Sequence, residues 1–195
     1  MNTKQTDLLQ SMLARFSENA ANAGAKRYVD QIAAFTASVA RPWCRATLEG
    51  HLTASACVLD CTHTHTAMIQ HRKLGRWLQP GGHVDDEDTS WRAAAQREVK
   101  EEVGLSAFIA LPDADHLFDV DVHPIPARPD VPAHFHYDLR FLFVATVDAA
   151  HDDTIKLNAD EAHDCHWFRL SNLANDPALE PALRRMVELC IRRFI

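Results

Sequence analysis

Residues 81–105 read GGHVDDEDTSWRAAAQREVKEEVGL: two glycines, an acidic turn and a helical segment that ends at a glycine. A helix advances about 100° per residue, so Glu98, Glu101 and Glu102 point in one direction. Three like charges at these spacings repel each other unless a cation or solvent compensates. This stretch therefore predicts a helix with one acidic face.

The acidic face has two interpretations. Carboxylates without a nearby cysteine suit Mg²⁺ or Mn²⁺, which bind a few oxygens and take further ones from a phosphate ligand. Alternatively, the face is only solvated, because most charge runs on surface helices serve solubility. The residues around the helix decide between the two.

Those residues resemble the Nudix box, whose pattern is G-x5-E-x7-R-E-U-x-E-E-x-G-U, with U an aliphatic residue. Gly82 matches the first position, and the second half of the pattern is complete at Arg97, Glu98, Val99, Glu101, Glu102, Gly104 and Leu105. The resemblance extends over about residues 48–172, through GHLTASA at 50–56, HRKLGRWLQPGGH at 71–83 and Trp167-Phe168.

One position departs from the box. Counted from Gly82, the first glutamate of the pattern falls on Asp88, and eight residues instead of seven separate it from Arg97. Asp88 is therefore either a supporting acid or an ordinary helix N-cap, which accepts the first free N–H groups of the helix. Trp91, Ala95 and Val99 recur at helical spacing and predict a buried stripe, and Gly104 predicts the helix end.

The resemblance implies an α/β (α+β) fold, a Nudix-like α/β/α sandwich with a mixed sheet. We expect an N-terminal helical extension at residues 1–47 and a Nudix domain at 48–195. Apolar residues at helical spacing predict two helices between residues 4 and 40, around a softer patch at 19–24. Strands are predicted at 51–59, 66–72, 76–79, 116–125, 134–147 and 163–170, and a last helix at 177–193.

The resemblance also implies an activity, that of a hydrolase acting on phosphoric anhydrides. In this family divalent metal ions bind a diphosphate, and water attacks one of its phosphorus atoms. We expect a metal-dependent pyrophosphohydrolase that cleaves a nucleoside-diphosphate-linked or other organic diphosphate. The expected cofactor is Mg²⁺, with Mn²⁺ as the alternative.

Site residues follow position by position from the box. Glu98 and Glu102 are expected as direct metal ligands, and Glu101 as a third ligand or as the base that reaches the water. The carbonyl of Gly81 is expected to add an oxygen, and Arg97 to orient the glutamates. Glu161 is the expected downstream carboxylate, with an exposed loop acid as the alternative.

Basic residues and histidines supply the expected substrate contacts. Arg45, Arg72, Arg76 and Arg140 are candidates for phosphate binding, and His51 and His83 border the box. Two alternating polar patterns predict one-sided ladders on two strands: Asp119, Asp121 and His123, then His134, His136, Asp138 and Arg140. These ladders have three interpretations: the solvent-exposed wet face of a sheet that is covered on one side only, the lining of a phosphate or substrate site, or a zinc-type site.

Amino-acid composition limits the classes of partner that the protein is expected to bind. The net charge of −7 and the lack of a Lys/Arg cluster argue against nucleic acid. Five cysteines without a CxxC pair indicate neither a zinc knuckle nor a disulfide framework. No segment reaches the roughly 20 apolar residues of a membrane helix and no signal region is visible, so we expect a cytoplasmic protein without membrane contact. The N-terminal helices pack on the domain or on a second subunit, which favours a homodimer.

Two further functions fit the same resemblance. The first is an isomerase similar to the Nudix isopentenyl-diphosphate isomerases, which the histidine ladders make conceivable, although the characteristic cysteine context is missing. The second is a non-catalytic protein that senses a nucleotide. Such sensors commonly lose box carboxylates, and here Glu98, Glu101 and Glu102 are all present.

Overall fold

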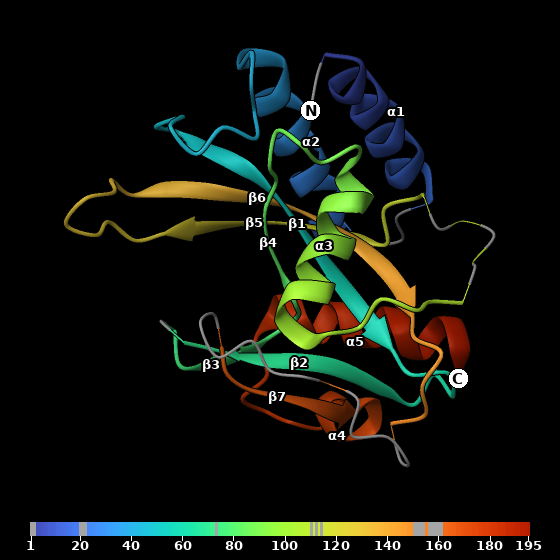
Figure 1. Cartoon of the computed structure of the whole chain (residues 1–195). Coiled ribbons are helices and arrows are strands. Elements are labelled where there is room, and N and C mark those ends of the chain that lie inside the picture. Colours follow the sequence, from blue (N-terminus) through green and yellow to red (C-terminus); the bar gives the residue numbers. More distant parts are fainter. Residues whose placement is uncertain are drawn as a thin grey trace. The chain divides into compact units, whose positions relative to one another are not determined.

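The computed structural model describes residues 3–19, 23–72, 74–109, 111, 113, 115–149, 155 and 162–195. Its helices are α1 (Thr3–Asn19), α2 (Ala23–Ser38), α3 (Trp91–Val103), α4 (Leu170–Ala174) and α5 (Pro181–Phe194) (Figure 1). Its strands are β1 (Gly50–Leu59), β2 (His65–His71), β3 (Arg76–Leu78), β4 (Gly81–His83), β5 (Asp119–Ile125), β6 (His134–Val144) and β7 (Ala162–Arg169). The predicted fold class is confirmed: helices are combined with a sheet, and a pair of helices precedes the first strand in the sequence.

Hydrogen bonds connect the strands in the order β3-β2-β1-β6-β5, while β4 pairs with β1 and β7 with β2. The pairs β1–β2, β2–β3, β2–β7 and β5–β6 are antiparallel. Two short elements, β4 and α4, were not predicted. Both fall below the length at which periodicity is informative, and β4 consists of two glycines and a histidine.

The chain divides into two compact units, which we describe separately. The first comprises residues 1–55, 82–95 and 115–141. Here α2 packs on β5, and the ring of Phe35 stacks on that of Tyr137 with centroids 4.1 Å apart. The indole Nε1–H of Trp91 donates to the carbonyl of Gln5 on α1 at 3.0 Å. The N-terminal helices thus pack on strands and on the start of α3, while the domain boundary at residue 48 stays a prediction.

The second unit comprises residues 56–81, 96–114 and 142–195. In it β2 pairs with β7 along its whole length, from His65 opposite Arg169 to His71 opposite Ala162. On α5, buried side chains recur at helical spacing: Leu183, Met186, Val187 and Cys190. This apolar stripe provides the packing face of the last helix, because one side of an amphipathic helix must leave water.

Both ends of α3 have identifiable caps. The hydroxyl of Ser90 accepts the N–H of Ala93 at 3.0 Å, so Ser90 is the N-cap and the prediction of Asp88 in that role is wrong. Asp88 instead accepts the N–H of Asp85 at 2.8 Å and closes the acidic turn. Gly104 ends the helix with φ +73°, as predicted.

The predicted stripe of Trp91, Ala95 and Val99 on α3 is buried. Within the described part of the chain, no helix combines the length and apolar character that crossing a bilayer requires.

Candidate active site

The carboxylate face of α3, formed by Glu98, Glu101 and Glu102, is uneven in its exposure. Glu98 is 7% and Glu102 is 4% exposed, although ionised glutamates rarely leave water without compensation. The side chain of Glu101 is 44% exposed. The two buried carboxylates are one helical turn apart, so the helix itself sets their common direction.

Arg97 holds two members of this face. Its Nη1 lies 3.0 Å from Oε1 of Glu98 and 2.9 Å from Oε2 of Glu101. The bond to Glu101 spans i and i+4, the spacing at which helical side chains meet. Arg97 therefore holds Glu98 and Glu101 by these contacts, while the supporting role expected from the box stays a prediction.

Gly81 contacts the third member. Its N–H donates to Oε2 of Glu102 at 2.7 Å, so the start of β4 and the helix meet at this carboxylate. Gly81 has φ +152°, a conformation that residues with a side chain rarely adopt. The expected metal contact of the Gly81 carbonyl stays a prediction, since the observed contact is made by the N–H.

This donor set fits a hard divalent cation. Three carboxylates share one helix face, and the guanidinium that contacts two of them is a single positive charge. Buried carboxylates need a positive partner, and Mg²⁺ prefers carboxylate oxygens combined with ligand phosphates. Glu98 and Glu102 are the members best shielded from water and are the residues that would hold it.

The predicted phosphate ligands Arg76 and Arg45 contact acidic side chains. Arg76 on β3 forms an ion pair with Glu180, and Arg45 lies 3.5 Å from Asp85. Arg72, at the end of β2, is exposed. Glu161 lies outside the described residues.

Arg140 is buried and surrounded by acids. Its guanidinium lies 3.0 Å from Asp119, 3.4 Å from Asp121 and 3.0 Å from Asp138, and the residue is 2% exposed. Burial lowers the pKa of Arg140, but the three carboxylate charges outweigh burial and the pKa lies above its usual value. We call these four residues the Arg140 network; its geometry supports a structural role for Arg140 and offers no support for the predicted substrate contact.

The network also tests the ladder prediction. Asp119 pairs with Arg140, Asp121 with Asp138 and His123 with His136 across β5 and β6. The predicted one-sided alternation is therefore confirmed. However, Asp119 and Asp121 are buried, as are Val120 and Leu139 on the other face, so a wet face is wrong for this end of the sheet.

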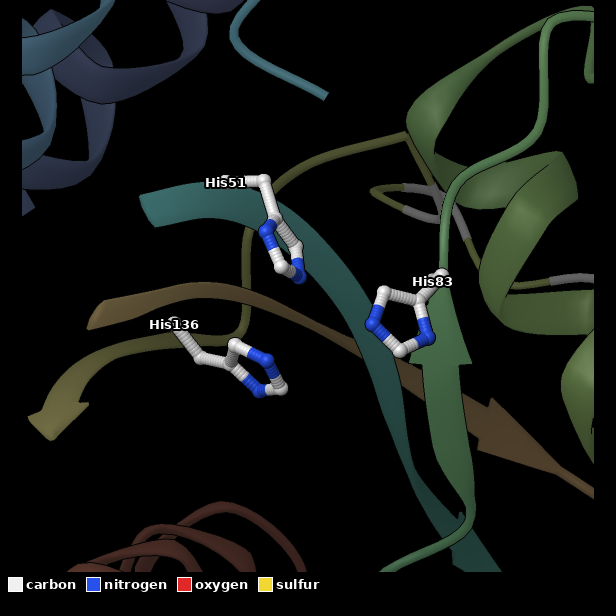
Figure 2. A group of neighbouring side chains, drawn as sticks. All are labelled: His51, His83 and His136. Atoms are coloured by element: carbon white, nitrogen blue, oxygen red, sulfur yellow. The ribbon is translucent and has the colours of Figure 1, made fainter. Parts of the chain in front are cut away.

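Three histidines from different strands converge in the first unit (Figure 2). His51 comes from β1, His83 from β4 and His136 from β6, and one ring nitrogen of each lies within 4.8 Å of the others. Ring centroids are 4.9 Å apart for His51–His83 and 4.7 Å for His51–His136. We call this group the histidine cluster. His136 was predicted only as a member of the polar ladder, with a zinc-type site among its interpretations, and the fold brings it to the other two.

Burial keeps two of these imidazoles, those of His51 and His136, neutral. Desolvation, followed by the charges of His134 and Arg45, lowers the pKa of His51 to about 4. Desolvation, followed by the neighbouring histidines, lowers the pKa of His136 to about 2. Both side chains therefore present nitrogen lone pairs at neutral pH.

A model of the NUDIX domain family matches residues 50–190. The chain therefore belongs to the Nudix family, whose hydrolases act on phosphoric anhydrides, and the predicted class of enzyme is confirmed. A search of curated proteins found none that matches the chain.

Solved Nudix structures share the fold. An Ap4A hydrolase of C. elegans, solved as a binary complex, is 17% identical, with a TM-score of 0.54, over 73% of this chain and 96% of that one. A NUDIX-family hydrolase from Clostridium perfringens is 21% identical (TM-score 0.52; 73% and 97% covered). The NUDIX domain of Shewanella oneidensis NrtR, complexed with ADP-ribose, is 16% identical (TM-score 0.50; 74% and 88% covered).

Proposed function

We propose that this protein is a Mg²⁺-dependent pyrophosphohydrolase that cleaves a nucleoside-diphosphate-linked or other organic diphosphate by water attack at phosphorus. The observation that carries this proposal is the burial of Glu98 and Glu102 on one face of α3, within the Nudix box. Burial of carboxylates is costly, and a bound cation would add to the compensation that Arg97 gives Glu98 and that the Gly81 N–H gives Glu102. A solvated helix face has no such requirement.

The residues divide the work. Glu98 and Glu102 hold the cation, and Mn²⁺ suits the same oxygens. Arg97 orients Glu98 and Glu101 through its two ion pairs, and the exposed Glu101 is the proposed acceptor of a proton from the attacking water. The Gly81 N–H holds one oxygen of Glu102, which fixes that carboxylate for its task. Bound Mg²⁺ supplies charge neutralisation of the diphosphate and activation of water.

Substrate binding requires further positive groups. Arg72 and Arg45 are exposed and suited to the outer phosphate oxygens, and Arg76 becomes available when it leaves Glu180. Glu161 is proposed as the downstream carboxylate. The names of the similar structures mention Ap4A and ADP-ribose, so dinucleoside polyphosphates and nucleotide sugars come first among compounds to test.

The test is a metal-dependent activity screen. The purified chain, loaded with Mg²⁺ or Mn²⁺, is offered dinucleotides, nucleotide sugars, nucleoside triphosphates and CoA esters, and the phosphomonoester products are separated by chromatography as the readout. We expect turnover of at least one class, and Glu102→Gln to lower it by about 100-fold or more, because a metal ligand contributes several kcal/mol to transition-state stabilisation. Glu188→Gln, an exposed change on α5, is the matched control and keeps full activity.

Two outcomes oppose this proposal and correspond to the alternative functions. Proton exchange on isopentenyl diphosphate without hydrolysis identifies an isomerase. Tight nucleotide binding with no product from any class identifies a sensor.

A further inference from the structure

We propose that the histidine cluster, His51, His83 and His136, is a binding site for a transition-metal dication such as Zn²⁺, separate in donor chemistry from the carboxylate face of α3. Three imidazoles leave one tetrahedral position open. With no carboxylate in the group, the bound ion keeps its full charge, so the open position takes water or an anionic oxygen.

The first argument is convergence. One nitrogen from each ring already lies within 4.8 Å of the others. Zn–N bonds of about 2.0–2.1 Å in a tetrahedron put ligand nitrogens about 3.3 Å apart. Rotations of the three rings, which Figure 2 shows turned toward a common space, are enough to close that difference.

The second argument is the unusual state of His51. It is 3% exposed, yet neither ring nitrogen has a hydrogen-bond partner in the described part of the chain. A buried imidazole normally pairs its nitrogens, because an unsatisfied polar atom away from water costs about 1–3 kcal/mol. A bound cation satisfies one of these nitrogens directly. Packing alone leaves both unsatisfied.

The third argument is that the strands hold the histidines in place. Thr53 and Ser55, two and four residues after His51, donate to the carboxylate of Asp138 at 3.0 and 2.7 Å. Asp138 is two residues after His136, so these bonds fix the faces of β1 and β6 on which both histidines lie.

Gly50 brings the same two strands close. The N–H of Phe135 donates to the carbonyl of Glu49 at 3.1 Å. A Cβ at Gly50 would collide with the carbonyl of Phe135, so only glycine permits this approach directly before His51 and His136. Rigid elements with locked neighbours are what a metal site of defined geometry requires.

The fourth argument is selectivity. Imidazole suits Zn²⁺, Cu²⁺, Fe²⁺ and Ni²⁺, whereas Mg²⁺ requires oxygen ligands. His134 adjoins the cluster, with its ring centroid 5.1 Å from that of His51, and its Nδ1–H donates to the carbonyl of Pro132 at 2.9 Å. Among the described residues, the ligand atoms that lie within 4.8 Å of one another belong to His51, His83 and His136, so these three are the proposed ligands.

Cobalt substitution provides the test. The untagged chain is stripped with a chelator, freed of it and titrated with Co²⁺. Four- or five-coordinate Co²⁺ bound by imidazoles absorbs visible light strongly, whereas octahedral Co²⁺ on carboxylates absorbs weakly. We expect the strong band to saturate at one equivalent, and added Zn²⁺ to abolish it by displacement.

Variants of the histidine cluster show which residues produce the strong Co²⁺ band. His83→Ala and His136→Ala, at half-buried positions, should weaken Co²⁺ affinity by more than the roughly 10–100-fold that loss of an outer-shell partner causes. His163→Ala, at an exposed strand position, is the matched control and should retain the band. Circular dichroism of each variant confirms that it folds. The decisive variants are those of His83 and His136, because substitution of the buried His51 risks unfolding the protein.

Two results would overturn the proposal: a weak octahedral spectrum alone, or a strong band that persists in both cluster variants. Glu98→Gln separates this test from that of the hydrolase. It should lower kcat/KM for hydrolysis by about 100-fold while leaving the strong band intact, so either proposal can fail without the other.

Discussion

The carboxylate face of α3 and the histidine cluster are built in opposite ways. The first takes all its donors from one helical turn, is oxygen-only and is partly exposed at Glu101. The second takes one donor from each of three strands, is nitrogen-only and contains an imidazole with two unsatisfied nitrogens. Local spacing is sufficient to specify the first, whereas the second exists only after the strands have paired.

The largest expected effect concerns the strands beside the histidine cluster. Arg140→Met should destabilise the protein by about 3–5 kcal/mol, because it leaves three buried carboxylates without their cation. Urea unfolding measures the change. Arg128→Met, at an exposed position, is the control and should stay within about 0.5 kcal/mol. An unchanged urea midpoint for Arg140→Met would mean that the Arg140 network contributes no stability.

The next prediction compares two residues within the carboxylate face of α3. Glu98→Gln should lower kcat/KM by about 100-fold, and Glu101→Gln by only about tenfold, because we propose the buried carboxylate as the cation ligand and the exposed one as an assisting group. Kinetics at several Mg²⁺ concentrations check this, since Glu98→Gln should also raise the Mg²⁺ requirement. Equal losses would show that burial does not distinguish ligand from base.

A smaller effect tests how the histidines are held. Ser55→Ala removes a hydrogen bond to the buried Asp138 and should cost about 1.5–3 kcal/mol in unfolding free energy. It should also weaken Co²⁺ binding by about tenfold, as loss of a supporting contact does. Ser171→Ala, at an exposed position on α4, serves as the comparison. Destabilisation with unaltered Co²⁺ affinity would contradict the positioning role.

The smallest effect concerns the start of the helix that carries the carboxylates. Ser90→Ala should lower stability by about 1 kcal/mol, because the N–H of Ala93 loses its acceptor, and Ser90→Asp should restore it. Thermal unfolding of the two variants gives the difference. A larger loss from Asp88→Ala than from Ser90→Ala would return the capping role to Asp88.

The sequence predicted the elements that have a clear period and missed those that do not. Helices with buried stripes, such as α3 and α5, and the long strands were found to within a few residues. The cap was misplaced because Asp88 and Ser90 are both good N-cap residues, and only the position of the first helical turn distinguishes them. The three-residue β4 is too short to show a period.

The candidate sites also differ in how far a local sequence pattern specifies them. Helical spacing predicted that Glu98 and Glu102 share one helix face, whereas the resemblance to the Nudix box named them and Arg97 as site residues, and these roles stay predictions. Arg140 looked like a phosphate ligand in the sequence, since its three acidic partners come from two strands whose register had to be known. His136 joined His51 and His83 for the same reason, through pairing that no local pattern encodes.

The polar side chains shared by β1 and β6 have a consequence for folding. Side chains alternate between the faces of a strand, so a slip of β6 by one residue would move Asp138 to the opposite side, away from Thr53 and Ser55. It would also carry the Arg140 guanidinium away from Asp119 and Asp121 on β5 and put Leu139 in its place. Misaligned pairings are therefore heavily penalised, and the chain has a single workable alignment for these two strands.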